Sequence, residues 1–160
     1  MNNTQRAAVV AKAELMIAQA AFIDYDMERP FPILTTSDLK ALNATKKVAF
    51  DCSASVVNAF QGSGAHDPSG FNYSGNGNTE TMMTFLSNHY TDVVAAHPAA
   101  LIVFNADGPL AQQHVCLVLA QGLNPWLMSH GSDAGPIKIR YSAELAVHPG
   151  RICCLNVSHD

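Results

Sequence analysis

The stretch that decides the fold runs from Val48 to Phe60 and reads VAFDCSASVVNAF. It begins with three apolar residues, passes Asp51, and continues with apolar residues at the spacing of a helix. Because Asp is a preferred helix N-cap residue, the pattern predicts a helix that begins just after Asp51. Cys52 is therefore expected in the first turn of that helix.

A cysteine in a first helical turn is suited to nucleophilic chemistry. The reactive form is the thiolate, and the unpaired N–H groups and dipole of a helix N-terminus favour a negative charge there. The same N–H groups can hold the oxyanion of a tetrahedral intermediate. Asp51 and Ser53 flank Cys52 and are expected to support this turn. The alternative is a small buried cysteine without a chemical role, and placement alone favours neither interpretation.

A nucleophilic thiol also needs a base, and the chain contains seven histidines. His114 opens the apolar run His114–Leu119, and His130 closes the run Trp126–His130. If the two runs pair as strands across the short loop between them, His130 lies next to His114, as an orienting group would. We interpret the other five as ordinary surface or core residues: His66, His89, His97, His148 and His159.

A zinc site is the chemical alternative, because Cys52, His114 and His130 resemble the ligand set of some catalytic zinc sites. The chain lacks the CxxC or HExxH spacing that would strengthen this interpretation, so we expect no metal and no cofactor. The other cysteines are Cys116, in an apolar run, and the adjacent pair Cys153 and Cys154. Neighbours on a strand point to opposite faces, so we expect this pair to pack in the core as free thiols.

The remaining periodicity predicts helices first and strands afterwards, which is typical of an α+β domain. We expect a helix from Asn3 to Ile23 that is stopped by Pro30 and Pro32. Connecting structure with a short helix capped by Ser37 is expected over Pro30–Lys47. A long loop over Gly62–Asn78 and a helix over Met82–Tyr90 are expected after the cysteine helix. The expected strands, in a largely antiparallel sheet, are Ala100–Phe104, His114–Ala120, Trp126–His130, Pro136–Arg140 and Arg151–Val157. With no linker or internal repeat, we expect a single domain over residues 1–160.

Composition excludes some classes of function. Nine Lys and Arg against 13 Asp and Glu give a net charge of −4, and the basic residues form no stripe that would bind nucleic acid. No apolar run approaches the length that spans a bilayer, and the N-terminus lacks the pattern of a signal peptide. We therefore expect a soluble chain that is made without an export signal of its own.

Two motifs resemble those of a known family. Phe50-Asp51-Cys52-Ser53-Ala54-Ser55-Val56 is similar to the (F/A)DCSxxV motif of NlpC-type cell-wall peptidases, and the run His114–Leu119 is similar to their HVxxxx strand. The resemblance is closest to the lysin-like peptidase modules of actinobacterial phages, in which similar segments follow each motif. These segments are Asp67–Gly77 and Ser129–Pro136, so the resemblance covers about Val48 to Arg140.

The resemblance implies a papain-like α+β fold with Cys52 as nucleophile, His114 as general base and His130 as the residue that holds the imidazole. Asp51 would cap and shape the turn. No cofactor is implied, and the implied substrate is a stem-peptide amide of bacterial peptidoglycan. The resemblance also implies an enzyme that is made in the host cytoplasm and acts at the bacterial cell wall, as a phage lysin or as a virion-associated enzyme. The family's Pro-Gly-Asp appears here as Pro98-Ala99-Ala100, and its tyrosine before the cysteine motif has no near counterpart, since Tyr25 is distant in sequence.

Two other functions remain open. A catalytically inactive relative would bind wall peptides or a partner, although the intact Cys52, His114 and His130 set argues against it. A thiol acyltransferase or an amidase on another substrate would share the same residues, because a fold does not fix a substrate.

Overall fold

The architecture is an α+β fold built on a five-stranded antiparallel sheet, seen in a computed structural model that describes residues 1–131 and 135–157. Ser132–Ala134 in the segment Ser129–Pro136, and His159, lie outside the described residues. The strand order is β6-β5-β4-β3-β7. Along the chain these strands are β3 (Leu101–Phe104), β4 (His114–Ala120), β5 (Trp126–Ser129), β6 (Ile137–Arg140) and β7 (Cys153–Leu155). All five predicted strands and their antiparallel pairing are thus confirmed, with small differences at the ends.

Both faces of the sheet are buried, which explains why β4 is apolar at consecutive positions. Val115, Leu117 and Leu119 belong to one apolar cluster, whereas Cys116 and Val118 belong to the cluster on the opposite face. The same alternation holds in β7, where Cys153 lies in the first cluster and Cys154 in the second, as predicted. All four cysteines of the chain are free and buried.

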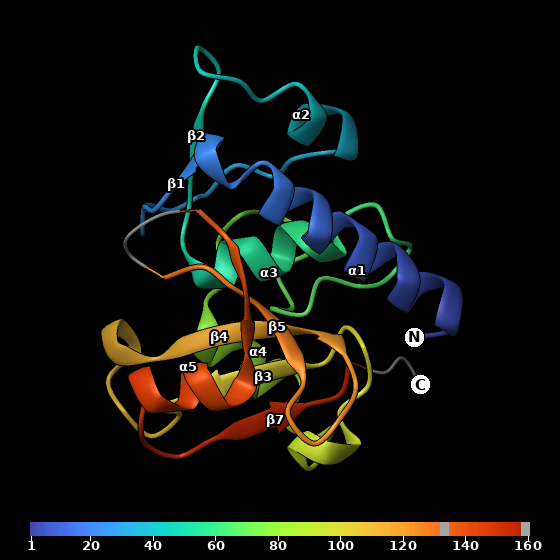
Figure 1. The fold of residues 1–160 in the computed structure, drawn as a ribbon, viewed down its shortest axis with the longest axis vertical. Helices are drawn as coiled ribbons and strands as arrows, with labels where there is room; N and C mark the ends of the chain where they lie inside the picture. Colours follow the sequence, from blue (N-terminus) through green and yellow to red (C-terminus); the bar gives the residue numbers. More distant parts are fainter. Residues whose placement is uncertain (132–134, 158–160) are drawn as a thin grey trace.

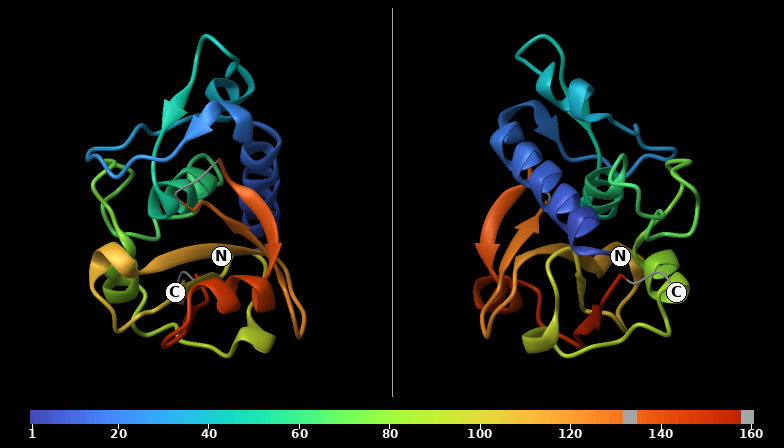
Figure 2. Two further views of the ribbon diagram at one scale, coloured as in Figure 1. Left: turned by 60° about the vertical axis from the view of Figure 1, so that its left-hand side comes forward. Right: turned by 90° about the vertical axis from the view of Figure 1, so that its right-hand side faces the viewer.

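Helices cover the two faces. Helices α1 (Asn3–Ala18) and α3 (Cys52–Phe60) lie together on one side of the sheet, and α5 (Tyr141–Val147) lies on the other (Figures 1 and 2). Every residue of α3 is buried, because the helix is enclosed between α1 and the sheet. Its Asn58 side chain accepts a hydrogen bond from the N–H of Leu34 at 2.7 Å and so fixes the connecting chain as well.

The N-terminal helix ends earlier than predicted. It stops at Ala18, is followed by the 3₁₀ helix η1 (Ala20–Phe22), and gives way to the strand β1 (Ile23–Asp24). The expectation that Pro30 and Pro32 stop this helix was wrong. The reason is a parallel pairing of β1 with β2 (Val48–Ala49), which buries Ile23 completely and requires an extended backbone there.

Other helices also differ from the prediction. Helix α2 (Thr36–Lys40) is capped by Thr35 and not by Ser37, and α4 (Thr79–Phe85) begins earlier than expected, after its cap residue Asn78. Helix α4 does not reach Tyr90, which instead pairs with Leu155 at the edge of the sheet. Helix α5 was not predicted. The predicted loop between α3 and α4 is confirmed.

Two further 3₁₀ helices lie in connecting segments, η2 (Val93–Ala95) between α4 and β3, and η3 (Leu110–Gln112) between β3 and β4. Among the described residues, no helix has both the length and the apolar character needed to cross a membrane.

Candidate active site

Cys52 is the first residue of α3, as the sequence predicted. Asp51 caps the helix by accepting a hydrogen bond from the N–H of Ala54 at 2.9 Å, and a second one from the Ser53 hydroxyl at 2.8 Å. The N–H groups of the first turn have no carbonyl partners within the helix. The Cys52 thiol therefore lies where the positive end of the helix dipole and free N–H groups favour negative charge.

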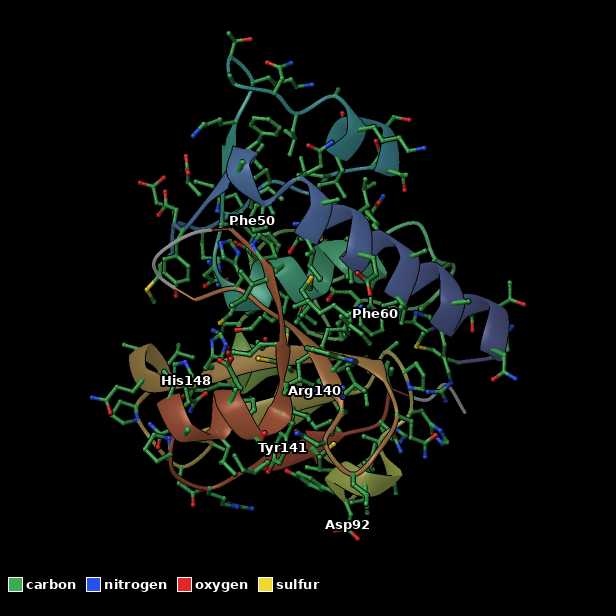
Figure 3. The ribbon with its side chains drawn as sticks, viewed as in Figure 1. Phe50, Phe60, Asp92, Arg140, Tyr141 and His148 are labelled. Carbon is green, nitrogen blue, oxygen red and sulfur yellow. The ribbon has the colours of Figure 1, made fainter. Side chains whose placement is uncertain are left out.

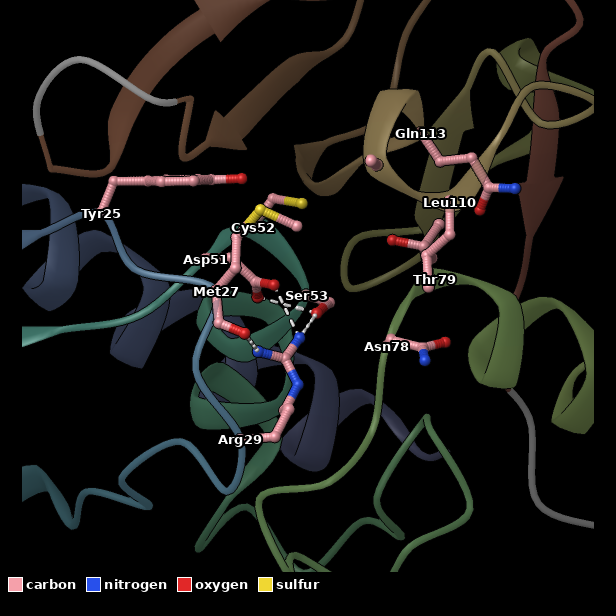
Figure 4. A pocket seen from close by; sticks show the side chains of 11 residues that line it. Tyr25, Met27, Arg29, Asp51, Cys52, Ser53, Asn78, Thr79, Leu110 and Gln113 are labelled. Atoms are coloured by element: carbon pink, nitrogen blue, oxygen red, sulfur yellow. Dashed lines mark hydrogen bonds and ion pairs between the residues drawn. The ribbon is translucent and has the colours of Figure 1, made fainter.

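Arg29 holds this turn from outside the helix. Its Nη2 lies 2.6 Å from Oδ2 of Asp51 and donates to the Ser53 hydroxyl at 2.9 Å, and its Nε donates to the carbonyl of Gly77 at 3.1 Å. One guanidinium thus links the chain after β1, the start of α3 and the chain before α4. Figure 4 shows its contacts with Asp51 and Ser53. Its positive charge also offsets the Asp51 carboxylate, which would otherwise oppose a thiolate on Cys52.

A cavity of about 150 Å³ opens onto Cys52. On one side lie the Cys52 turn and the chain after β1; on the other lie the start of α4 and η3 (Figure 4). Tyr25 extends its ring along the rim, with its hydroxyl toward Cys52 (Figure 4). Burial, together with Cys52 and Asp51, raises the pKa of Tyr25 to about 12, so its hydroxyl remains a hydrogen-bond donor at neutral pH. Cavity-lining residues from the far side include Thr79, Leu110 and Gln113.

His114 is the first residue of β4, and its side chain is almost fully buried. Its Nε2 lies 2.9 Å from the Ser129 hydroxyl and 3.0 Å from Oε1 of Glu144. The Ser129 hydroxyl in turn lies 3.1 Å from the same Glu144 oxygen. A carboxylate and a hydroxyl therefore fix the plane of the imidazole from the side of α5.

The charge state of this pair follows from its contacts. Burial acts to lower the pKa of His114, but Cys116, Cys52 and Glu144 act in the opposite direction and raise it well above its ordinary value. Burial acts to raise the pKa of Glu144, but hydrogen bonds from His114 and Ser129 outweigh it and lower that pKa. Both shifts favour an imidazolium beside a carboxylate. Cys52 is among the neighbours that raise the pKa of His114, so the predicted nucleophile and the predicted base lie near each other.

His130 does not occupy the position that we expected. Its Nδ1 lies 2.7 Å from the Ser55 hydroxyl on α3, and its Nε2 has no hydrogen-bond partner among the described residues. The reason is the alternation of side chains along a strand. Ser129, one position earlier, lies on the face of His114 and meets it, whereas His130 lies on the opposite face, toward α3.

The His130 ring is enclosed by aromatic neighbours, Tyr25 and Phe50, which meet it edge-on with ring centroids at 5.5 Å and 5.8 Å. Burial lowers the pKa of His130 to about 4, so the ring is neutral at physiological pH. A neutral, packed imidazole supports the wall of the site and does not contact the Nε2 of His114.

The alternative zinc set of Cys52, His114 and His130 is likewise not assembled. Within the described ranges, the group of possible ligands whose donor atoms lie close together is His114, Glu144 and His148. A second cysteine near His114, Cys116, is fully buried on the His114 face of β4, and burial raises its pKa. Cys116 is therefore a neutral thiol in the wall.

Three important residues were missed by the sequence interpretation. Glu144 carried a usable signal, because it lies four residues before His148, which is the spacing of neighbours on one helix face. Tyr25 was judged too distant, but the parallel pair β1–β2 brings the chain after β1 beside the Cys52 turn. Arg29 carried no local signal, since its partners lie 22 and 48 residues away.

The fold and the site together define an α+β protein with a helix-terminal thiol at a cavity and a buried imidazole–carboxylate pair formed by β4 and α5. The sequence matches no known family model, and it has no significant match among curated proteins.

Proposed function

We propose that the chain is a cysteine amide hydrolase with a papain-like fold of the NlpC type, acting on stem peptides of bacterial peptidoglycan. One observation carries the chemistry. A cysteine at the start of a buried helix lies beside a histidine whose far nitrogen is held by a carboxylate. The substrate class rests on the resemblance of the segments around Cys52 and His114 to that family.

The reaction follows the roles of these residues. Cys52 first gives its proton to His114, which forms the imidazolium that the raised pKa of His114 favours. The Cys52 thiolate then attacks the carbonyl carbon of the amide, and first-turn N–H groups receive the developing oxyanion. As the C–N bond breaks, His114 returns the proton to the leaving amine, which leaves a thioester on Cys52. His114 then takes a proton from water, whose oxygen attacks the thioester. The C–S bond breaks, His114 returns the proton to the Cys52 sulfur, and the product leaves as a carboxylic acid that ionises in solvent.

Glu144, in place of His130, supplies the positioning group in this mechanism. Because Glu144 and Ser129 occupy Nε2, the other ring nitrogen is left to exchange a proton with sulfur. The carboxylate also stabilises the imidazolium that forms when Cys52 gives up its proton. Arg29 keeps the Cys52 turn in place, and the Tyr25 hydroxyl is available as a donor to a bound substrate.

The test is a digestion of purified peptidoglycan by wild type, Cys52→Ala and Cys153→Ala, with mass spectrometry of the fragments. We expect fragments with newly freed amino groups from wild type and from Cys153→Ala, and none from Cys52→Ala. Cys153 is the matched control because it is also a buried free thiol but lies on β7. Products that persist in Cys52→Ala would refute the proposed nucleophile.

The two alternatives are separated by two further measurements. A binding module without catalysis would show no selective alkylation of Cys52 at neutral pH and no products, whereas the proposal requires a reactive thiol. An acyltransferase would transfer the acyl group to an added amine in preference to water. Amide products that replace the carboxylate products when an amine is added would favour that function.

A further inference from the structure

We propose that His114, Glu144 and His148 form a binding site for a divalent transition-metal ion of the zinc type, and that this ion inhibits the hydrolase. The binding site stands on its own geometry. Its inhibitory effect rests on the function proposed above, because it requires His114 to be the base.

The three donor atoms already lie close together. Oε1 of Glu144 lies 3.0 Å from Nε2 of His114 and 3.3 Å from Nε2 of His148. The donor atoms of all three residues lie within 4.8 Å of one another. Zinc–ligand bonds of about 2.0–2.2 Å in a tetrahedron place neighbouring donors roughly 3.3–3.5 Å apart. The observed separations from Glu144 are close to these.

The chemistry of the donors selects the class of ion. Two imidazole nitrogens and one carboxylate oxygen suit zinc and its neighbours, whereas magnesium and calcium prefer oxygen ligands alone. Three protein ligands leave a fourth position for water. The Ser129 hydroxyl, 3.1 Å from Oε1 of Glu144, is placed to hold the carboxylate in its binding orientation.

The fold also provides the chelate and a route of entry. Glu144 and His148 are four residues apart at the end of α5, so they project from the same side of one helical turn. The His148 ring stacks on that of His114, with centroids 4.4 Å apart, and its side chain is 31% exposed, whereas His114 and Glu144 are buried. Figure 3 shows His148 at the outer end of α5, where an ion can arrive from solvent.

Binding would remove the base from catalysis. An ion on Nε2 of His114 separates the imidazole from the Glu144 carboxylate and prevents formation of the imidazolium. Cys52 then has no group to receive its proton. The ion therefore inhibits without any contact with Cys52 or with the substrate cavity.

The binding test uses the full-length protein and two metal ions. Protein is equilibrated with Zn²⁺, freed of excess metal, and its metal content measured; Co²⁺ then replaces Zn²⁺ for visible spectroscopy. We expect one ion per chain in wild type, Cys52→Ala and His97→Gln, and at least roughly tenfold weaker binding in His148→Gln. His97 is the matched control because it is an exposed histidine remote from α5.

The Co²⁺ spectrum identifies the ligands. The proposal requires a tetrahedral spectrum with nitrogen and oxygen ligands and without the intense thiolate-to-metal band. Unchanged binding in His148→Gln, lost binding in Cys52→Ala, or a thiolate band would each overturn the site.

The inhibitory effect is tested separately from metal binding. Added Zn²⁺ should lower the rate of peptidoglycan hydrolysis by wild type and by His97→Gln but should not change the rate of His148→Gln. If the protein binds the ion as described but hydrolyses no peptidoglycan, the proposed function fails and the metal site stands. If it hydrolyses peptidoglycan and its rate does not respond to Zn²⁺, the inhibition fails and the proposed function stands.

Discussion

The carboxylate of Glu144 is the group on which the His114 imidazole depends. It is buried on the same side of the sheet as the imidazole, and its Oε1 contacts both the His114 ring and the Ser129 hydroxyl. His130, only one position after Ser129, lies on the opposite side. The one-residue step from Ser129 to His130 therefore decides which side chain contacts His114 and which contacts Ser55 on α3.

Glu144→Gln tests this division of roles. We expect it to lower kcat for peptidoglycan hydrolysis on the order of 10²-fold with little change in KM, because the amide cannot stabilise the imidazolium. His130→Gln should leave kcat within about threefold and should lower the free energy of unfolding by about 1 kcal/mol through loss of the Ser55 contact. Steady-state kinetics and urea unfolding measure both. A larger loss of kcat in His130→Gln than in Glu144→Gln would restore His130 as the orienting residue.

The ion pair between Arg29 and Asp51 is a second contact whose loss should affect stability. Arg29→Met leaves the buried Asp51 carboxylate without its cation, and we expect the free energy of unfolding to fall by about 3 kcal/mol. Asp51→Asn keeps an N-cap side chain, so it should cost less. In the double variant the two losses should be clearly less than additive. Additive losses in urea unfolding would show that the pair is not energetically coupled.

Residues that form local patterns were predictable, and residues that depend on tertiary contact were not. Cys52 and Asp51 were placed correctly because an N-cap residue and the helical spacing of apolar residues can both be recognised in one short stretch of sequence. His114 was correctly placed at the start of a strand. The partner of His114 was missed because it lies on a helix, α5, that the sequence interpretation did not contain.

At the scale of elements, the packing of α1 on α3 includes a buried cation. Lys12 on α1 donates hydrogen bonds to the carbonyl of Leu34 at 2.7 Å, and to the carbonyl and side-chain oxygens of Gln61 at 2.8 Å and 2.7 Å. Burial lowers the pKa of Lys12 to about 8, with a smaller opposing effect from Asp38. Helix α1 is therefore joined to the end of α3 by the Lys12 side chain, whose positive charge lowers the free energy of unfolding.

This effect predicts a pH dependence of stability. Between pH 8 and 10.5 Lys12 is largely neutral in the folded chain and largely charged in the unfolded chain, so the unfolded state binds more protons. The free energy of unfolding of wild type relative to Lys12→Met should therefore rise with pH across this interval, by about 1–3 kcal/mol in total. The difference between the two proteins removes the shared contributions of tyrosines and thiols. A difference that does not change with pH would contradict the lowered pKa.

Boundaries between elements show where sequence patterns fail. The apolar period of α1 continues toward Ile23, yet the helix ends at Ala18 because pairing of β1 with β2 favours an extended chain. Such pairing depends on a segment more than twenty residues away, which no local pattern contains. This boundary also creates the site, because the chain that leaves β1 carries Tyr25 and Arg29 to Cys52.

At the scale of the whole molecule, one apolar cluster connects the helices to the sheet. It includes residues of α1, α3, β3, β4 and β7, and Trp126 on β5 packs against it. The antiparallel sheet itself was predictable, because apolar runs separated by turn residues mark its strands. The order of those strands was not predicted, since it depends on the return of β7 beside β3.

Continuity of this cluster predicts a single unfolding transition. Trp126 is the only tryptophan of the chain, so its fluorescence reports on the sheet, whereas circular dichroism in the far ultraviolet reports largely on the helices. The two signals should give the same midpoint and slope in urea. Two separate transitions would show that the helical part and the sheet are independent domains, contrary to the single domain that the sequence predicts.

The long loop between α3 and α4 has a consequence for how the protein could be divided. It separates the chain into a first part that carries the thiol and a second part that carries the imidazole and the carboxylate. A break at its exposed start, at Gly62 or Gly64, would give two fragments that each hold an incomplete set of reacting groups. Fused to two interacting proteins, these fragments would bring Cys52 and His114 together again only when their carriers meet, so that the proposed hydrolysis would report the association.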